Sequence, residues 1–539
     1  MALLAWLATC VSVMAFLFFY KRGEILLYGD AIAHINIARR VFDSRTPGLL
    51  QLGTVWLPLP HLLILPFIVS MSLWQRGGGG SIPSMAAYIF AVVGIFRLAG
   101  SALWPDREKE PDLRVRVAAW IAAIVVAANP NLIYIQSTAM GESLYLAFFI
   151  WSIVYFAGWM KGSDQDLLKC GLCLAAACLT RYDGWFLAAV VGVVVVWRAI
   201  VARTEQSDKA VKRTRRVVVQ FLLIVAAAPA LWLAYNGIVY RNPLEFENGP
   251  YSAKAIERRT ETPGHPGHPG SGNLRLSAQY FVKAAEDNMA QSPWLERGWL
   301  VFVFAGVVLA AMDGRAVPRS PAIFVLLLLL VPLPFYAISV DRGGVPIFIP
   351  EWWPYTHYNV RYGLQLLPAF AFAASFLAHA ALRAEGFDRR LRLACILGLI
   401  SFAGASYATV WNATPLCLKE AQINMRTRTQ LEAELATWLE KLPPNSTVLM
   451  YLGDHVGAAE RAGFPLSHTI NEGNHRTWRQ PADPEGLWER ALANPSQYVD
   501  FVLAFEGDPV WKAVHTLHLK ELLELHVTGQ PRAILYQTR

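Results

Sequence analysis

The chain has 539 residues, of which 55% are hydrophobic and 16% are charged, and its formal net charge is +8. A soluble globular domain carries about 25% charged residues, so this composition excludes an ordinary soluble protein and indicates an integral membrane protein. The basic residues gather in short loops between apolar runs, which is how membrane topology is encoded. No basic stripe is interleaved with aromatic residues, so we exclude nucleic acid as a partner.

Eleven apolar runs are long enough, or nearly so, to cross a bilayer, which takes about 20 residues per helix. The first run is long for the core of a signal peptide, so we expect a retained helix. The runs 167–180 and 184–198 are short, and an alternative is that they form two half-buried helices. The predicted spans are 2–20, 82–103, 117–136, 143–160, 167–180, 184–198, 217–236, 298–312, 321–340, 361–381 and 394–412.

A further apolar run, 56–74, decides on which side the loops lie. If it spans the membrane, the basic loops 198–216 and 383–393 fall outside; if it lies along the interface, both fall inside. The positive-inside rule favours the second arrangement, with 56–74 as a juxtamembrane or re-entrant helix. The outer face, where we expect the chemistry, then carries segments 21–81, 137–142, 237–297 and 341–360 and the tail from about residue 415.

The tail differs in character from the rest of the chain, because strand-like and helical patterns replace the long apolar runs. We expect a polytopic membrane domain over 1–414 and a small extracytoplasmic α/β domain over 415–539, which is a usual domain size. The predicted strands are 447–452, 501–505 and 533–536, and the predicted helices are 427–441, 485–493 and 510–525.

Asp30 follows the first apolar run and lies four residues before His34, so on a helix the two side chains share one face. One interpretation is an acid near the start of a helix at the membrane surface, where it suits the helix dipole. The other, which we favour, is a general base or metal ligand that faces a cavity, because acids beside membrane helices are costly to desolvate.

Glu142 opens the fourth predicted span and either caps that helix or converges with Asp30 on the outer face. Convergence would give two catalytic carboxylates, Asp30 and Glu142, for proton transfer. A divalent metal ion, if one takes part, would be held by the same pair. Arg181 and Asp183 lie in the break between two short runs, where a local ion pair explains them at least as well as a substrate contact.

Cationic and aromatic residues in two outer segments are candidate substrate contacts. The stretch before the tenth span is an interfacial aromatic belt, yet its Arg361 would meet the bilayer surface where a phosphate lies, and guanidinium binds phosphate bidentately. The loop 237–297 is basic and then rich in Pro and Gly over 263–270, which indicates a mobile lid. The candidate contacts in these two segments are Tyr355, His357, Tyr358 and Arg361, and Lys254, Arg258 and Arg259.

The ordered set of features over residues 1–415 resembles the GT-C glycosyltransferases, the polytopic class that uses polyprenyl-phosphate-linked sugars. Within that class the pattern is most similar to the dolichyl-phosphate-mannose protein mannosyltransferase, aminoarabinose transferase and RgtA/B/C/D-like group. The features are an acid after the first helix, a Pro-rich amphipathic helix beginning Trp56-Leu-Pro-Leu-Pro-His61, an acid before the fourth helix, the Thr180-Arg-Tyr-Asp-Gly-Trp185 break, and Arg361-Tyr362 entering a helix with Pro368.

The resemblance implies an inverting transfer of a sugar from a polyprenyl-phosphate donor to a glycan, lipid or protein acceptor. Asp30 would deprotonate the acceptor, and Arg361 with the basic loop would neutralise the departing phosphate. Aromatic rings such as those of Trp56, Tyr355 and Tyr358 would stack on the sugar. Many relatives have two adjacent acids where this chain has Gly29-Asp30, and several have Asp in place of Glu142, which puts the use of a metal in doubt.

Two other classes of function stay open from the sequence. A transporter or flippase would use Asp30 and His34 as a proton relay, and such proteins often show inverted repeats, of which we find no convincing example. A non-catalytic scaffold would bind a glycan through its tail. In every case we expect a multi-pass protein of the bacterial inner (plasma) membrane.

Overall fold

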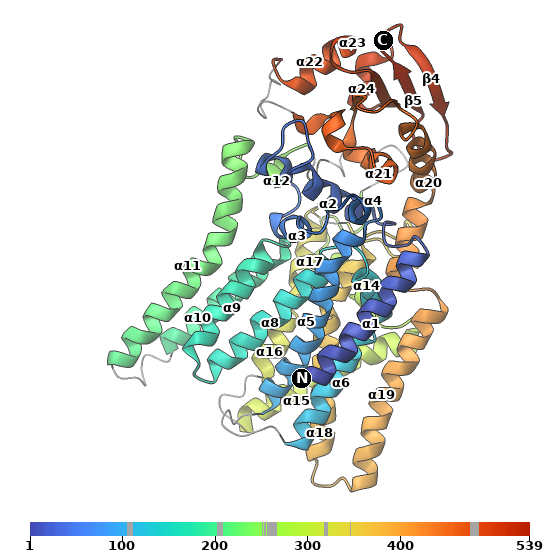
Figure 1. Ribbon diagram of the computed structural model, residues 1–539. Helices are drawn as coiled ribbons and strands as arrows, with labels where there is room; N and C mark the ends of the chain where they lie inside the picture. The colour runs from blue at the N-terminus through green and yellow to red at the C-terminus, as the bar shows by residue number, and fades with distance from the viewer. Residues whose placement is uncertain are drawn as a thin grey trace.

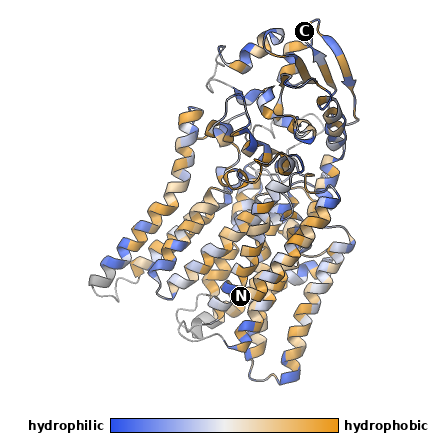
Figure 2. Ribbon diagram, viewed as in Figure 1, coloured by the Kyte–Doolittle hydropathy of each residue, from blue (hydrophilic) through white to orange (hydrophobic). Residues whose placement is uncertain are grey.

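The computed structural model describes the chain except for residues 105–111, 202–207, 251, 253–254, 256–266, 317–321, 345, 475–483 and 539. Long apolar helices form a bundle, and a smaller mixed α/β region lies at one end of it (Figures 1 and 2). Within the described residues, nine helical segments are long and apolar enough to cross a membrane. They are α1 (Ala2–Lys21), α5 (Gly78–Leu103), α8 (Glu142–Met160), α10 (Asp183–Val201), α11 (Asp208–Val239), α15 (Pro293–Ala316), α16 with α17 (Ala322–Leu329, Pro332–Asp341), η3 with α18 (Val360–Leu366, Leu367–Arg383), and α19 (Arg389–Asn412) continued by α20 (Leu416–Leu439).

The other two predicted spans are also helices of the bundle, but they are shorter. These are α6 (Leu113–Ala127), which packs against α5 and α18, and α9 (Asp164–Cys178), which packs against α8 and α11. The predicted run 117–136 is not one helix, because Asn129 caps a new one, α7 (Pro130–Ile135), by accepting from the backbone N–H of Leu132. Pro130 suits the first position of that helix, because proline has no backbone N–H and this position needs none.

The run 56–74 does not span, in agreement with the prediction. It forms two short helices, α3 (Pro58–Ile64) and α4 (Met71–Gln75). Both lie beside α2 (Gly29–Arg40) at the end of the bundle below the C-terminal region, by which we mean residues 415–538 (Figure 1). Seven and five residues give about 10 and 8 Å of helix, far short of the hydrocarbon thickness.

The basic clusters lie at the opposite end of the bundle from the C-terminal region. The turn that joins α18 to α19, with Arg383, Arg389 and Arg390, is at the bottom of Figure 1, and the adjoining ends of α10 and α11 lie at its lower left. The positive-inside rule would place that end in the cytoplasm. The separation of the two ends is a property of the structure, and the side of the membrane stays a prediction.

The C-terminal region contains a five-stranded sheet in the order β2-β1-β3-β5-β4, with β1 parallel to β2 and β3 and with β5 antiparallel to β3 and β4. The three predicted strands correspond to β1, β3 and β5. The predicted helix 510–525 is wrong beyond Val514, because Lys520–Leu525 pairs with β5 as an edge strand. Its elements are β1 (Val448–Met450), β2 (Thr469–Ile470), β3 (Phe501–Phe505), β4 (Lys520–Leu525), β5 (Ala533–Gln537), α21 (Leu452–Ala462), α22 (Leu487–Ala493), α23 (Pro495–Tyr498), α24 (Pro509–Val514), η4 (Leu466–His468) and η5 (Glu472–Asn474).

The C-terminal region docks on α2 and on the segment that follows it. The Asn36 amide on α2 donates to Glu460 Oε2 of α21 at 2.5 Å. The backbone N–H of Ser467 donates to Asp43 Oδ1 at 2.9 Å. The same interface includes η1 (Leu49–Leu52), whose Gln51 amide donates to the carbonyl of Gly473 at 2.8 Å. The remaining short helices are α12 (Glu245–Asn248) and α14 (Leu274–Asp287), of which α14 packs against α17 and η3.

Candidate active site

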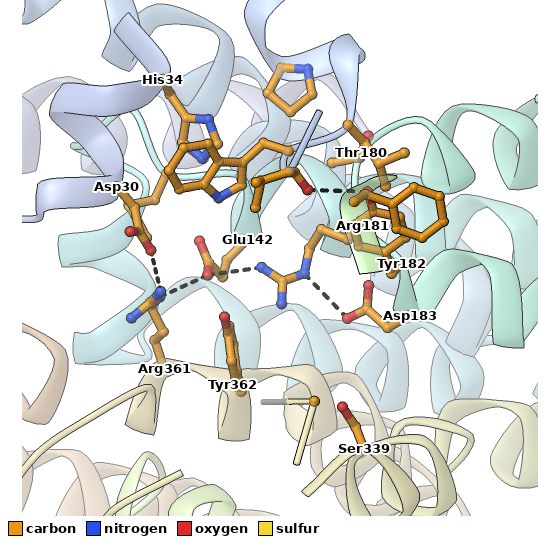
Figure 3. Close-up of a pocket in the computed structure, with 18 of the residues that line it drawn as sticks. Asp30, His34, Glu142, Thr180, Arg181, Tyr182, Asp183, Ser339, Arg361 and Tyr362 are labelled. Carbon is orange, nitrogen blue, oxygen red and sulfur yellow. Dashed lines mark hydrogen bonds and ion pairs between the residues drawn. The ribbon is translucent and has the colours of Figure 1, made fainter. Parts of the chain in front are cut away.

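A cavity of about 390 Å³ lies where α2, α8, α10, α17 and η3 meet, at the end of the bundle that carries the C-terminal region. Its wall combines carboxylates and guanidiniums with aromatic rings (Figure 3). The lining residues are Asp30, His34, Val55, Trp56, Leu57, Pro60, Met140, Gly141, Glu142, Thr180, Arg181, Tyr182, Asp183, Phe246, Glu247, Phe335, Tyr336, Ser339, Gly344, Arg361 and Tyr362.

Asp30 lies in the first turn of α2, after an N-cap at Tyr28 with extended backbone. An acid in this turn is favoured by the helix dipole, so both interpretations of Asp30 apply at once: it suits the helix start and it lines the cavity. Its side chain is 38% exposed, the largest exposure among the acids bound to Arg361. An approaching ligand can therefore reach this carboxylate.

Arg361 joins Asp30 to Glu142. Arg361 Nη2 lies 2.5 Å from Asp30 Oδ2, and its Nε lies 3.0 Å from Glu142 Oε1 (Figure 3). Glu142 is the first residue of α8 and is only 1% exposed. The structure thus brings together three residues that were predicted to lie on the same face. Glu142 is 112 positions after Asp30 and 219 before Arg361, and both carboxylates bind the Arg361 guanidinium.

A third carboxylate on this guanidinium was missed by sequence reasoning. Glu420 of α20 is 2% exposed, and its Oε1 lies 2.9 Å from Arg361 Nη1. The backbone N–H groups of Asn359 and Val360 donate to the same carboxylate at 3.2 and 2.8 Å. Glu420 comes after the predicted domain boundary at 414, and no motif singles it out. The only signal is an acid that closely follows the last apolar run.

Arg181 and Asp183 form the ion pair that the sequence allowed, and both also line the cavity. Arg181 Nε lies 3.2 Å from Asp183 Oδ2, and its Nη1 lies 3.1 Å from Glu142 Oε1. The Tyr336 hydroxyl of α17 donates to Asp183 Oδ2 at 2.9 Å. The break between α9 and α10 therefore places a second guanidinium, that of Arg181, in the site. Glu142 accepts hydrogen bonds from both Arg181 and Arg361 (Figure 3).

His34 is buried and lines the cavity one helical turn after Asp30. Its ring meets the Trp56 ring edge-on at 5.3 Å between centroids. Burial lowers the pKa of His34, and the opposing effects of two nearby carboxylates and two guanidiniums do not reverse this shift. His34 is therefore a neutral imidazole at pH 7.

The other predicted contacts lie away from the lining. Tyr355 is 69% exposed, and neither Tyr355, His357 nor Tyr358 is among the residues that line the cavity. Lys254, Arg258 and Arg259 lie outside the described residues. Of these seven candidate residues, Arg361 is the one found among the described residues that line the cavity. The other six remain predictions.

Several lining residues were not singled out as substrate contacts in the sequence analysis, although Tyr182 lies in the 180–185 break. The Tyr182 ring stacks on the Phe246 ring of α12 at 4.9 Å, and its hydroxyl donates to the carbonyl of Val55. The Trp232 indole of α11 donates to the same hydroxyl at 3.2 Å. These contacts tie the loop before α3 to α11 and give the cavity an aromatic side.

The predicted metal pair does not fit a divalent cation in this geometry. The space between Asp30 and Glu142 contains the guanidinium of Arg361, which binds one oxygen of each. A divalent cation there would face a like charge at close range. Across the part of the chain that the structure describes, no group of three His, Cys, Asp or Glu side chains is arranged to hold a metal.

Comparisons with known proteins find a partial family match and similar folds. The family model for dolichyl-phosphate-mannose-protein mannosyltransferase matches residues 111–241, which is less than half of the chain. No curated protein sequence matches. The crystal structure of ArnT from Cupriavidus metallidurans bound to undecaprenyl phosphate is similar with a TM-score of 0.52 and 13% identity over 98% of both chains. Its apo state has the same TM-score and coverage at 15% identity.

The oligosaccharyltransferase of Archaeoglobus fulgidus, in complex with Zn and sulfate, matches with a TM-score of 0.48 and 12% identity over 98% of this chain and 72% of that one. Similarity at these sequence identities establishes the fold alone. The fold assignment rests on ArnT, whose TM-score is the higher. The resemblance that the sequence predicts is confirmed: the chain is a multi-pass membrane protein with the fold of the GT-C glycosyltransferases.

Proposed function

We propose that the protein is an inverting glycosyltransferase that moves a sugar from a polyprenyl-phosphate donor to a glycan, lipid or protein acceptor at the outer face of the membrane. The mannosyltransferase family match and the fold shared with ArnT, which was solved with undecaprenyl phosphate, support the reaction class. The observation that carries the proposal is the cavity in which one guanidinium joins a reachable carboxylate, Asp30, to a buried one, Glu142.

In the proposed reaction Asp30 is the general base. One oxygen of its carboxylate is held by Arg361, and the side chain remains partly exposed to the cavity. The acceptor gives its proton to Asp30 as its oxygen attacks the anomeric carbon of the donor sugar. The bond from that carbon to the phosphate oxygen breaks, and the electron pair leaves with the polyprenyl phosphate. Attack from the face opposite the leaving group inverts the anomeric configuration.

Arg181 and Arg361 are the described cations that line the cavity and would stabilise the departing phosphate. Arg361 gives three of its N–H groups to Asp30, Glu142 and Glu420, which leaves two of the five for a ligand. Glu142 lines the cavity and orients both guanidiniums. Its second oxygen, Oε2, is buried without a partner among the described residues, so it is available to a sugar hydroxyl.

His34, Trp56 and Asp183 complete the proposed contacts of the cavity wall, with the Trp56 ring available for stacking on a sugar. The basic loop residues Lys254, Arg258 and Arg259 keep their predicted role in phosphate binding. The outer-face assignment is supported by the position of the cavity, which lies at the end of the bundle opposite the basic clusters of α11, α18 and α19 (Figure 1).

The test is reconstitution of the full chain in liposomes with radiolabelled polyprenyl-phosphate sugars and a panel of glycan, lipid and peptide acceptors. We expect labelled product whose anomeric configuration, read by NMR, is inverted relative to the donor. Movement of label across the bilayer without transfer would overturn the proposal in favour of a transporter. Binding of the donor without either event would favour a scaffold. A product with retained configuration would contradict Asp30 as a simple base.

A further inference from the structure

Two buried histidines contact each other behind the cavity wall. His34 Nδ1 on α2 and His61 Nε2 on α3 lie 2.8 Å apart, which is a hydrogen bond. His34 lines the cavity, whereas His61 does not and is completely buried. The second nitrogen of His34, Nε2, has no hydrogen-bond partner among the described residues. The second nitrogen of His61, Nδ1, is buried with no partner among those residues either.

Both rings are neutral near pH 7. Burial lowers the pKa of His34 and takes that of His61 well below its ordinary value. Around His34, the carboxylates of Asp30 and Glu142 oppose the guanidiniums of Arg181 and Arg361, and around His61 the nearby charge is that of Arg40. Each neutral ring has a single N–H, so the hydrogen bond between the rings links their tautomers.

Only two arrangements satisfy this bond. In the first, His61 donates from Nε2, so the unpartnered His61 Nδ1 is a bare lone pair and the proton of His34 is on Nε2. In the second, His34 donates from Nδ1, so His61 holds its proton on Nδ1 as a buried N–H with no acceptor. Among buried backbone groups, orphaned N–H donors are rarer than under-satisfied acceptors, and the same preference applied to the imidazole favours the first arrangement.

We propose that His34 presents an Nε2–H donor to a substrate oxygen in the cavity, and that His61 is the positioning residue that fixes this tautomer. The proposal rests on the glycosyl transfer proposed above. His34 cannot then act as a base through Nε2, which leaves that role to Asp30 one turn earlier. The oxygen that accepts the bond belongs to the donor, as either a phosphoryl oxygen or a sugar hydroxyl, and both accept a hydrogen bond from a neutral imidazole.

The neighbours of His34 indicate that it acts on the donor's sugar end. Its ring contacts the edge of Trp56, the aromatic ring proposed to stack on the sugar, and it is on the same helical face as Asp30. A donor at this position would orient the anomeric carbon relative to the base. Loss of the Nε2–H donor leaves a substrate oxygen unsatisfied in a buried site and so weakens donor binding.

The tautomers of His34 and His61 can be determined by NMR, without any measurement of activity. We expect ¹⁵N NMR of histidine-labelled protein in lipid nanodiscs, with signals assigned through His34→Gln and His61→Gln, to show both rings protonated at Nε2. Both rings protonated at Nδ1 would overturn the proposal. Because this result does not depend on turnover, it stands apart from the success or failure of the proposed function.

The kinetic test compares four variants in the reconstituted transfer assay. We expect His34→Leu to raise the KM for the donor about ten-fold, and His34→Gln, which keeps an N–H donor, to recover most of that loss. His61→Leu should raise the same KM by a smaller factor with kcat nearly unchanged, and it should shift His34 toward the Nδ1–H tautomer in the NMR spectrum. His518→Gln, at an exposed histidine, is the matched control.

Equal KM values for wild type and His34→Leu would overturn the contact with substrate. An unaltered His34 spectrum in His61→Leu would overturn the positioning role of His61. Binding of sugar-free polyprenyl phosphate to the same variants identifies the oxygen: weaker binding in His34→Leu assigns a phosphoryl oxygen, and unchanged binding with a raised donor KM assigns a sugar hydroxyl.

Discussion

Two regions of the molecule hold α2 in place, and they differ in the partners that they give to their acidic side chains. On the cavity side, Arg361 binds Asp30, Glu142 and Glu420, which we call the arginine network. On the other side, the C-terminal region contacts Asn36 and Asp43 through Glu460 and Ser467, which we call the docking contact.

In the docking contact Glu460 is 1% exposed and accepts a hydrogen bond from the neutral amide of Asn36. Burial raises the pKa of Glu460 to about 8. In the arginine network each acid faces a cation instead, so the charges are paired and oriented within the protein. The difference teaches that every acid of the arginine network is paired with a cation, whereas the docking contact combines a near-neutral carboxyl, Glu460, with an ion-paired one, Asp43, which lies 2.8 Å from Arg39.

The largest effect should come from removing the centre of the arginine network. Arg361→Met leaves Asp30 and Glu420 without their cation and leaves Glu142 with Arg181 alone, and we expect loss of measurable transfer and a destabilisation of about 3–5 kcal/mol. Transfer rate and thermal unfolding in detergent measure the two losses. Arg389→Met, an exposed arginine at the opposite end of the bundle, is the control. An Arg361→Met protein with wild-type transfer would show that the network is not needed for the chemistry.

A smaller loss is expected from Glu420→Gln, which keeps the shape of the side chain but removes its charge. Glu420 does not line the cavity, so this variant tests whether α20 positions Arg361 from behind. We expect kcat to fall roughly ten- to hundred-fold, which corresponds to a charge-assisted hydrogen bond of about 1.5–3 kcal/mol, with little change in the donor KM. Unchanged kcat would mean that Asp30 and Glu142 hold Arg361 without help from the C-terminal region.

The docking contact should respond to pH through Glu460. Because the pKa of Glu460 is raised from its ordinary 4.5 to about 8, the folded state holds one more proton than the unfolded state between these values. Stability should therefore fall as pH rises through this window. We expect the decline of Tm between pH 5 and 8 to be shallower in Glu460→Gln. Exposed Glu434→Gln is the control, and an equal decline in both variants would contradict the assignment.

The smallest effect is expected at Asp43, the second member of the docking contact. Burial acts against it, but hydrogen bonds from Ser467 and the guanidinium of Arg39 leave the pKa of Asp43 below its ordinary value. Its contribution to stability is thus present above about pH 4 and is lost as pH falls further. Asp43→Asn should cost roughly 1 kcal/mol at pH 7, measured by chemical unfolding, and less at pH 3. An equal cost at both pH values would contradict an ionic origin.

The sequence predicts most of the bundle and part of the site, for physical reasons that can be traced to particular residues. Long apolar runs and basic loops are local signals, so every predicted span is found to be helical, although 117–136 is divided between α6 and α7, and the run 56–74 forms only short helices, as predicted. The helix break at Asn129-Pro130 also has a local signal, a cap followed by Pro, which the long apolar run concealed.

Tertiary pairing is not written in local pattern. The segment Lys520–Leu525 has a helical spacing of Leu residues, yet pairing with β5 makes it a strand. Asp30, Glu142 and Arg361 were found because each opens a helix at a membrane surface. Glu420 was missed because its role comes only from the packing of α20 against η3, more than 50 positions after Arg361 in the chain. The His34–His61 pair has the same origin in packing between α2 and α3.

The central claim is that Asp30, held by Arg361, is the base of a glycosyl transfer. The most direct measurement is the transfer rate of Asp30→Asn in liposomes, with Asp388→Asn as the matched control, since Asp388 is an exposed helix cap that Asn can replace. The account predicts a fall of about 100- to 10,000-fold in Asp30→Asn, with donor binding retained, and no change in the control. Correctly folded Asp30→Asn protein that transfers sugar at the wild-type rate would contradict it.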